Sequence, residues 1–403
     1  MRTQEEPVNA IYVSSYIPRK CGIATFTKDL TNGINLLNAR SLAEILVVVR
    51  PEEELEYPWE AKFKIFKDDL STYLTAAEYV NQSNTDVVVL QHEFGLFGGE
   101  DGEYILHFIE ALKKPILTTC HTVLTNPSPK QAEILKRIVD RSEVVVVMME
   151  GVAGKLSEIY GVPEDKIVVI PHGVPDVTFG SDEKYKRKRQ LSGRFVLGNI
   201  NLLHPNKGIE YALEAVAVVA KVYPDVLYVV IGQTHPELKR EAGEAYRNYL
   251  KKRVRELGIT NNVRFVNEYL SLPDVLNWLK TMDVYVTPYL DPAQVTSGAL
   301  AYAIGAGKAC VSTSYVYANE VLAEGRGMLV PFRNAQALAE AVIELRRNPL
   351  KKREMEQLAY RFGRLMTWPN VAQRYVSLFR NVAQKHKTAL ESVEQPNTPA
   401  TPL

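Results

Sequence analysis

The fold of this chain is decided by the stretch VYVTPYLDPAQVTSGALAYAIGAGKACVST, residues 284–313. It opens with a short β-branched run, VYVTPY, that has the length and apolarity of a buried strand. A polar loop leads into a Gly- and Ala-rich segment that predicts a helix, and KACVST at 308–313 predicts a second strand. A strand, a helix and a strand in this order form one unit of a parallel sheet.

The same alternation runs through the whole chain. The other short apolar runs are AIYVSS, EILVVV, DVVVLQ, PILTTC, EVVVVM, KIVVIP, FVLGNI, LYVVIG and VRFVN. They are apolar on both faces, as expected for strands that helices cover on both sides. The sequence therefore predicts an α/β protein with two doubly wound parallel sheets.

The length of 403 residues favours two domains. A charged, polar stretch at 178–194 is typical of a linker, so we place the domains at 1–185 and 186–365. The last segment, 386–403, is polar and Pro-rich, and we expect it to be disordered.

Composition excludes several function classes. A net charge of +1 argues against a nucleic-acid partner, and the longest apolar runs are too short to span a membrane. The N-terminus has no apolar signal region, and Cys21, Cys120 and Cys310 lack the spacing of a disulfide framework or a zinc site. We expect a cytoplasmic protein with reduced thiols and no transmembrane segment.

Ligands of such sheets bind beyond the carboxyl ends of the strands, so the loops after strands are the candidate sites. Gly22 begins a helix after the first strand, where backbone N–H groups can approach an anion; a plain turn glycine is the alternative. Lys207 lies at the start of an amphipathic helix, where the helix dipole disfavours a cation by roughly 0.3–1 kcal/mol. An anion beside Lys207 explains this placement better than a solvated lysine, and the amides after Pro205 complete a phosphate seat.

Thr296, Ser297 and Gly298 predict a helix N-cap and first turn with free amides, either a second seat for an anion or hydroxyl or ordinary capping. His92 and His121 end strands, where a histidine can bind a hydroxyl or transfer a proton, although a structural histidine is the alternative. The segment GLFGGEDGE after Glu93 predicts a mobile loop on the acceptor side. The sequence has no DxD pair beside a strand, HExxH, GxSxG, P-loop or GxGxxG, so we expect no metal site and no nicotinamide chemistry.

The ordered motifs PRKCGIATF, CHT, IVVIPHGV, PNKGIEYALEA, VTPYLDPAQVTSGALAYAIGAGKACVST and EGRGMLVP resemble those of the retaining GT-B glycosyltransferases of family 4. The resemblance covers nearly the whole chain, and TWPNVAQRYVSLF is similar to the family's helix that crosses back to the first domain, here about 366–385. It implies two Rossmann-like domains, with a nucleotide-sugar donor held mainly by the second and the acceptor held by the first.

The resemblance also implies roles for single residues. Gly22 would lie at the donor diphosphate, Lys207 would pair with the phosphates, and His121 would contact the donor sugar or the leaving-group side. Lysine and helix amides would stabilise the leaving phosphate without a metal. We place the acceptor at His92 and Glu93. The expected donor-binding residues are Gln294, Thr296, Ser297, Gly298, Tyr302, His204 and Asn206.

The sequence departs from the family pattern at three positions. Gln294 and Tyr302 occupy the places of the two glutamates of the Glu-x7-Glu motif, and Leu202 occupies that of an arginine, for which His204 could partly substitute. Glutamine can still donate and accept hydrogen bonds with sugar hydroxyls, but a neutral contact to ribose is weaker than a charge-assisted one.

We therefore expect a retaining, metal-independent enzyme that needs no cofactor. It would move a hexose, mannose or glucose, from a nucleoside diphosphate sugar to a saccharide, a lipid-linked acceptor or another hydroxyl. A phosphorylase-like enzyme that uses a sugar 1-phosphate is the second hypothesis, and the missing ribose carboxylate favours it. A two-domain sugar-binding protein without turnover is the third.

Overall fold

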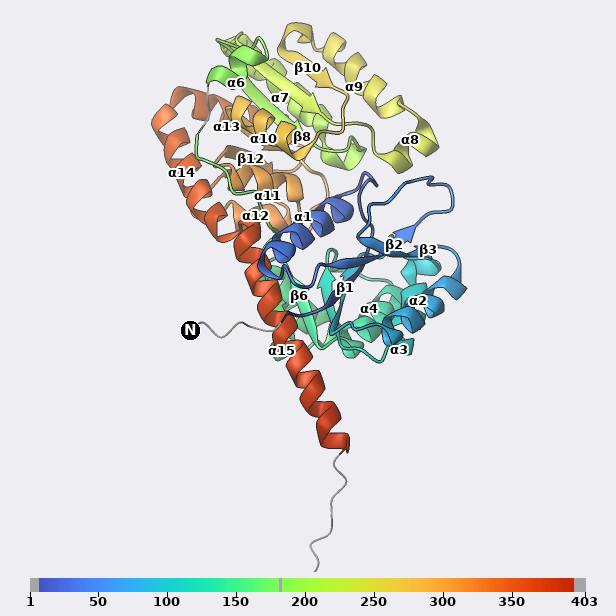
Figure 1. Ribbon diagram of the computed structural model, residues 1–403. Helices are drawn as coiled ribbons and strands as arrows, with labels where there is room; N and C mark the ends of the chain where they lie inside the picture. The colour runs from blue at the N-terminus through green and yellow to red at the C-terminus, as the bar shows by residue number, and fades with distance from the viewer. Residues whose placement is uncertain (1–6, 181–182, 395–403) are drawn as a thin grey trace, which may run out of the picture. The chain divides into compact units, whose positions relative to one another are not determined.

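The computed structural model describes residues 7–180 and 183–394, and it consists of two α/β units (Figure 1). The first unit is Met1–Pro171 with Pro369–Leu403, and the second is His172–Trp368. The junction thus lies before the predicted boundary at 185. The charged stretch that suggested a linker contains helix α6 (Glu183–Lys188), which Lys186 anchors to Asp283 of the second unit at 2.6 Å.

The first unit contains a seven-stranded parallel sheet with the order β3-β2-β1-β4-β5-β6-β7. The strands are β1 (Ala10–Ser14), β2 (Glu44–Val49), β3 (Ala61–Phe66), β4 (Val87–His92), β5 (Ile116–Cys120), β6 (Val144–Val147) and β7 (Ile167–Val169). Sequence patterning missed β3, because this edge strand alternates apolar and lysine residues and is only half covered.

Several of the first unit's helices begin at side-chain caps. Ser128 and Gln131, for example, form a capping box at the start of α4. The helices are α1 (Gly22–Leu37), α2 (Leu70–Gln82), α3 (Tyr104–Ala111), α4 (Pro129–Arg141), α5 (Glu150–Tyr160) and most of α15 (Trp368–Glu394), with short 3₁₀ turns at η1 (Glu100–Gly102) and η2 (Glu164–Lys166).

Helix α15, at the red end of the chain in Figure 1, belongs to the first unit from Pro369 onward. The Tyr375 hydroxyl lies 3.1 Å from Thr119 Oγ1, and the Phe379 ring lies edge-on to Tyr12. The helix continues through Glu394, so the part of the expected disordered tail from residue 386 to 394 is helical. The rest of that tail, 395–403, lies outside the described residues.

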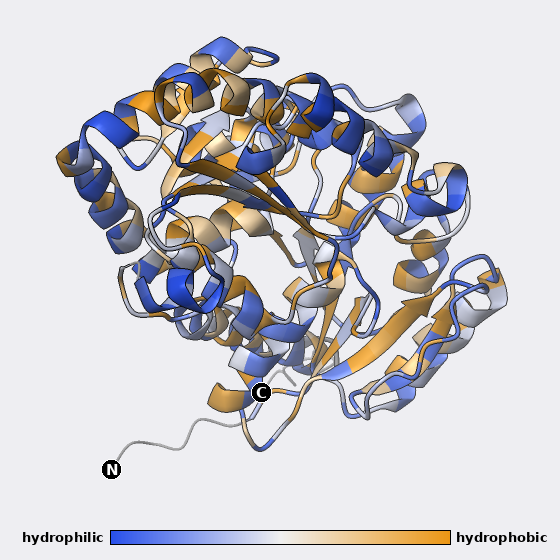
Figure 2. Ribbon diagram, turned by 90° about the horizontal axis from the view of Figure 1, so that it is seen from above, coloured by the Kyte–Doolittle hydropathy of each residue, from blue (hydrophilic) through white to orange (hydrophobic). Residues whose placement is uncertain are grey.

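The second unit contains a six-stranded parallel sheet with the order β10-β9-β8-β11-β12-β13. The strands are β8 (Phe195–Ile200), β9 (Val226–Ile231), β10 (Val263–Val266), β11 (Val284–Thr287), β12 (Ala309–Thr313) and β13 (Met328–Val330). Together the two sheets confirm the predicted α/β class. The strands are largely apolar, whereas the helices alternate apolar and hydrophilic residues (Figure 2).

The second unit's helices cover its sheet in the expected manner. They are α7 (Ile209–Val222), α8 (Pro236–Ala242), α9 (Ala245–Glu256), α10 (Leu272–Thr281), α11 (Gly298–Gly305), α12 (Val316–Val321), α13 (Ala335–Arg347) and α14 (Pro349–Leu365), with 3₁₀ turns at η3 (Pro205–Lys207) and η4 (Thr260–Asn262). The small residues of α11 allow a close approach to α14: a Cβ on Gly363 would lie 2.7 Å from the Cα of Gly305.

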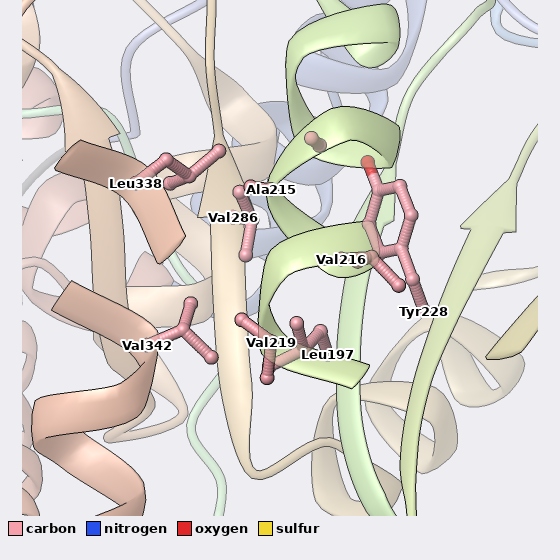
Figure 3. A pocket seen from close by; sticks show the side chains of 9 residues that line it. Leu197, Ala215, Val216, Val219, Tyr228, Val286, Leu338 and Val342 are labelled. Carbon is pink, nitrogen blue, oxygen red and sulfur yellow. The ribbon is translucent and has the colours of Figure 1, made fainter. Parts of the chain in front are cut away.

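A small cavity lies in the core of the second unit, where side chains of α7 and α13 meet those of β8, β9 and β11 (Figure 3). Its volume is about 10 Å³, and its lining is Leu197, Ala212, Ala215, Val216, Val219, Tyr228, Val286, Leu338 and Val342. Because this space is about that of one water molecule and its walls are apolar, it is a packing gap and no ligand site.

Strand order decides where ligands can bind in each unit. In the first sheet the chain proceeds from β1 to β2 on one side and later adds β4 on the other; β8, β9 and β11 repeat this arrangement in the second sheet. The loops after β1 and β4, and those after β8 and β11, therefore flank the topological switch points at which such sheets bind ligands.

Candidate functional site

In the second unit, the loops after β8 and β11 are docked on each other. The backbone N–H of Leu290 donates to the carbonyl of Asn206 at 2.9 Å. Gly208 has a φ of +60°, and a Cβ there would lie 2.0 Å from the carbonyl oxygen of Pro288. Only glycine fits at this contact, which fixes the turn that carries Lys207 against the β11 loop.

Lys207 is the last residue of turn η3, and Gly208 separates it from α7, close to where the sequence predicted it. Its Nζ lies 4.2 Å from the centroid of the Tyr289 ring. Burial lowers the pKa of Lys207 to about 8, and the charge of Asp291 opposes this shift. Across the described residues Lys207 has no ion-pair partner, so a partly desolvated ammonium is available for an incoming anion.

The N-terminus of α11 lies in the same docked pair of loops. Ser297 is its N-cap, as predicted: the hydroxyl accepts a hydrogen bond from the backbone N–H of Leu300 at 3.3 Å. The first-turn amides of a helix have no intrahelical acceptor and suit an anion or a hydroxyl. Gln294 braces this loop, because its side-chain nitrogen donates to the carbonyl of Thr296 at 2.8 Å.

His172 is a residue of this site that the sequence analysis did not single out, although it stands in the motif IVVIPHGV. Its Nδ1 lies 2.8 Å from the carbonyl oxygen of Gly173, which only accepts, so Nδ1 carries the proton. Burial lowers the pKa of His172 to about 4, so the imidazole is neutral and its Nε2 is an acceptor. A Cβ on Gly298 would lie 3.0 Å from this Nε2, and the ring centroids of His172 and Tyr302 are 6.0 Å apart.

His204 and Asn206 shape the Lys207 turn. The Nδ1 of His204 accepts a hydrogen bond from the backbone N–H of Asn206 at 3.2 Å, so His204 caps the turn. With Nδ1 acting as the acceptor, a neutral His204 presents its proton on Nε2. All eight residues predicted for the donor side, with Lys207 and His204 among them, therefore lie on the loops after β8 and β11 or on α11.

In the first unit, Gly22 begins helix α1 as predicted. Cys21 caps the helix, and its Sγ accepts from the backbone N–H of Ala24 at 3.3 Å. Gly22 is exposed, and a Cβ there would meet no protein atom within 4 Å. Protein packing therefore does not require glycine at this position, and the backbone there is open to an approaching group.

The other predicted residues of the first unit lie at the carboxyl ends of β4 and β5. His121 Nε2 lies 2.8 Å from Oε1 of Gln91, and its ring packs edge-on against Phe26. His92 is only 1% exposed, and burial lowers its pKa to about 4. Glu93 is half-buried and accepts a short hydrogen bond from Thr122. Glu93 is thus more accessible to a ligand than His92, and the acceptor role of both stays a prediction.

The loop after Glu93 differs from the expectation of a mobile segment. Phe97 is buried, a Cβ on Gly98 would lie 1.8 Å from the carbonyl oxygen of Lys67, and one on Gly102 would lie 2.5 Å from that of Phe94. These glycines serve close packing against the backbone, whereas glycine-rich composition alone suggested flexibility.

Within residues 7–180 and 183–394, no group of three or more His, Cys, Asp or Glu side chains is arranged to hold a metal ion. In the same ranges, no helix combines the length and apolarity that crossing a bilayer requires.

Two family models match the chain. The model of glycosyl transferases group 1 matches residues 181–362, and that of glycosyltransferase family 4 matches residues 41–177. Among curated proteins, the phosphatidyl-myo-inositol mannosyltransferase of Mycobacterium leprae is 25% identical over 223 residues, which are 54% of this chain and 54% of that protein. The chain thus matches about half the length of this relative.

Solved structures show the same fold. A sucrose-phosphate synthase from Thermosynechococcus elongatus has a TM-score of 0.74 at 15% identity, covering 94% of this chain and 100% of that one. HepE of Anabaena in complex with UDP has a TM-score of 0.72 at 14% identity, covering 93% and 100%. The two parallel-sheet units of this chain and their likeness to these structures identify the GT-B architecture. The chain belongs to the family 4, group 1 glycosyltransferases.

Proposed function

We propose that this protein transfers a hexose from a nucleoside diphosphate sugar to a hydroxyl acceptor, with retention and without a metal or cofactor. The observation that carries the proposal is Lys207, a partly buried ammonium with no ion-pair partner among the described residues. It lies over the ring of Tyr289, whose hydroxyl is 3.5 Å from Oγ of Ser297, the N-cap of α11. Such a cation beside free helix amides suits the phosphate of a donor and leaving group.

The proposed reaction needs no acidic or basic side chain of the protein to transfer a proton. The bond between the anomeric carbon and the phosphate oxygen breaks, and the acceptor oxygen bonds to the same face of that carbon. The acceptor proton passes to the leaving phosphate. Lys207 stabilises the charge that develops on this phosphate, so no carboxylate nucleophile is needed at Gln294.

The remaining roles follow the family resemblance. The amides at Gly22 would contact the donor diphosphate, and His121 the donor sugar. Thr296, Ser297 and Gly298 would bind hydroxyl or phosphate oxygens, and Glu93 would bind the acceptor. Mannose is the favoured sugar because the curated relative is a mannosyltransferase, and a saccharide or lipid-linked acceptor is consistent with that relative's name.

A phosphorylase-like reaction with a hexose 1-phosphate is the second candidate. One observation favours it: the neutral residues Gln294 and Tyr302 replace the carboxylates that would bind the donor sugar and the ribose. Such an enzyme would bind a sugar phosphate at Lys207 without needing a nucleotide.

The experiment is a transfer assay with UDP-, GDP- and ADP-linked glucose and mannose, in chelator, with an oligosaccharide acceptor panel and proton NMR of the product. We expect release of one nucleoside diphosphate and a new glycosidic bond with the anomeric configuration of the donor. An inverted product, or activity that chelation abolishes, would contradict the mechanism. Turnover only of hexose 1-phosphates would establish the second candidate instead.

A further inference from the structure

Tyr289 lies directly beneath Lys207 and has no role in the function proposed so far. It follows β11 and is 1% exposed. The Lys207 Nζ lies 4.2 Å from the centroid of its ring. A cation at this distance from the face of an aromatic ring is attracted by the ring's quadrupole.

Three contacts hold the Tyr289 ring in place. Its hydroxyl donates to Oδ1 of Asn201 at 2.5 Å and lies 3.5 Å from Oγ of Ser297, the N-cap of α11. Its ring stacks on that of Tyr315, with centroids 5.2 Å apart and planes at 18°. Burial raises the pKa of Tyr289 to about 12, so the hydroxyl stays protonated and remains a donor.

These contacts connect the two halves of the phosphate seat. The Tyr289 side chain contacts all three parts of the seat. These are Asn201 in the loop after β8, Ser297 at the N-cap of α11 and the ammonium of Lys207. The ring face fixes the ammonium laterally, which a flexible lysine side chain cannot do alone.

We propose that Tyr289 is a positioning residue whose ring face holds the Lys207 ammonium at the phosphate seat, while Asn201 and Tyr315 hold the ring. The proposal rests on the role of Lys207 given above. The ring acts on the titration of Lys207 in two opposite ways, since it excludes water and also attracts the charged form. Asp291 is the charged group that faces Lys207 from the β11 loop.

The attraction can be isolated with two rings of nearly the same shape. Tyr289→Phe keeps the electron-rich face, and Tyr289→pentafluorophenylalanine reverses its quadrupole at little change in volume. Lys207 is titrated in the ligand-free protein by trace acetylation with acetic anhydride across pH, followed by mass spectrometry of the Lys207 peptide. Each variant is first shown to melt cooperatively. The control is Tyr285→Phe, which alters a buried tyrosine whose hydroxyl contacts the backbone of Ile200.

Tyr289→Phe loses the hydrogen bond to Asn201 but keeps the ring face and its stacking on Tyr315, so we expect it and the control to titrate like the wild type. We expect the fluorinated variant to reach half-labelling about half a pH unit lower or more. We also expect kcat to fall more than KM rises in the fluorinated variant. Equal labelling curves for the two rings would overturn the proposal and leave Tyr289 a packing residue. The titration of Lys207 needs no substrate, so its result is independent of donor binding. If the wild type binds no donor, the proposed function is wrong, but the positioning of Lys207 by Tyr289 is still tested.

Discussion

At the scale of single residues, the chemistry of the second unit depends on which groups are charged. Lys207 is partly desolvated, and His172 is neutral with its proton held on Nδ1 by the carbonyl of Gly173. Asp291 is exposed, and its negative charge opposes the lowering of the Lys207 pKa. The site therefore offers a titrating lysine and a neutral imidazole acceptor, an arrangement suited to phosphate with hydroxyls beside it.

The affinity of a nucleoside diphosphate should therefore depend on pH through Lys207. With a pKa of about 8 in the free protein, Lys207 is charged at neutral pH and loses its proton above that value. We expect affinity to fall about tenfold between about pH 7 and about pH 9, because binding must then restore the proton. Calorimetry of the wild type should show this decline, and Lys207→Met should bind weakly with no dependence on pH in this range.

Sequence patterns identified residues at this scale unevenly. Lys207, Ser297 and Gly22 were predicted because each follows a strand, and strand order places such residues at a switch point. Tyr289 was missed because its role depends on a ring lying under an ammonium from another loop, which no local spacing encodes. His172 was missed for a similar reason, since its neighbour Gly298 is far along the chain.

At the scale of elements, the docking of the loop after β8 on the loop after β11 sets the geometry of the site. Position 208 requires glycine for two reasons: its φ is positive, and a Cβ would clash with the carbonyl of Pro288. Gly193 has a φ of +76° but open space around a Cβ. Substitution there therefore measures the cost of the backbone conformation without the cost of a steric clash.

We expect Gly193→Ala to reduce the free energy of unfolding by about 1 kcal/mol, the cost of a left-handed backbone. Gly208→Ala should cost about 2 kcal/mol or more, because a clash with the Pro288 carbonyl is added. Urea denaturation measures both values, and calorimetry should show weaker nucleotide binding for Gly208→Ala alone. Equal losses of stability would mean that the loops are not docked as described.

The elements themselves were well predicted where apolar runs were long. The exceptions have physical reasons: β3 alternates with lysines at a sheet edge, and β13 is only three residues long. The loop after Glu93 was misjudged because glycine permits both flexibility and close packing, and only the tertiary contacts of Gly98 and Gly102 decide between them.

At the scale of the whole molecule, each unit has a fully desolvated histidine in its described residues, His92 in the first and His172 in the second. Burial lowers the pKa of both to about 4. An unfolded chain binds protons at these histidines near pH 6.5. As pH falls below that value the unfolded state gains protons that the folded state does not, so stability declines down to about pH 4.

We expect each histidine to cost its unit about 2 kcal/mol of stability between about pH 7 and about pH 5. Denaturation followed at both values should show this loss, and His172→Gln should reduce it. His107, which is exposed on α3, supplies the control His107→Gln. A free energy of unfolding that is the same at both pH values would contradict the burial of these side chains as neutral groups.

The measurement that tests the account most directly is calorimetric titration with UDP, GDP, ADP and hexose 1-phosphates. It compares the wild type, Lys207→Met and the control Lys221→Met, which alters an exposed lysine on α7. We predict that one nucleoside diphosphate binds the wild type and the control equally, and that Lys207→Met loses about 1.5–3 kcal/mol of binding free energy. Unchanged binding in Lys207→Met would contradict the phosphate seat, and binding of hexose 1-phosphates alone would contradict the nucleotide-sugar donor.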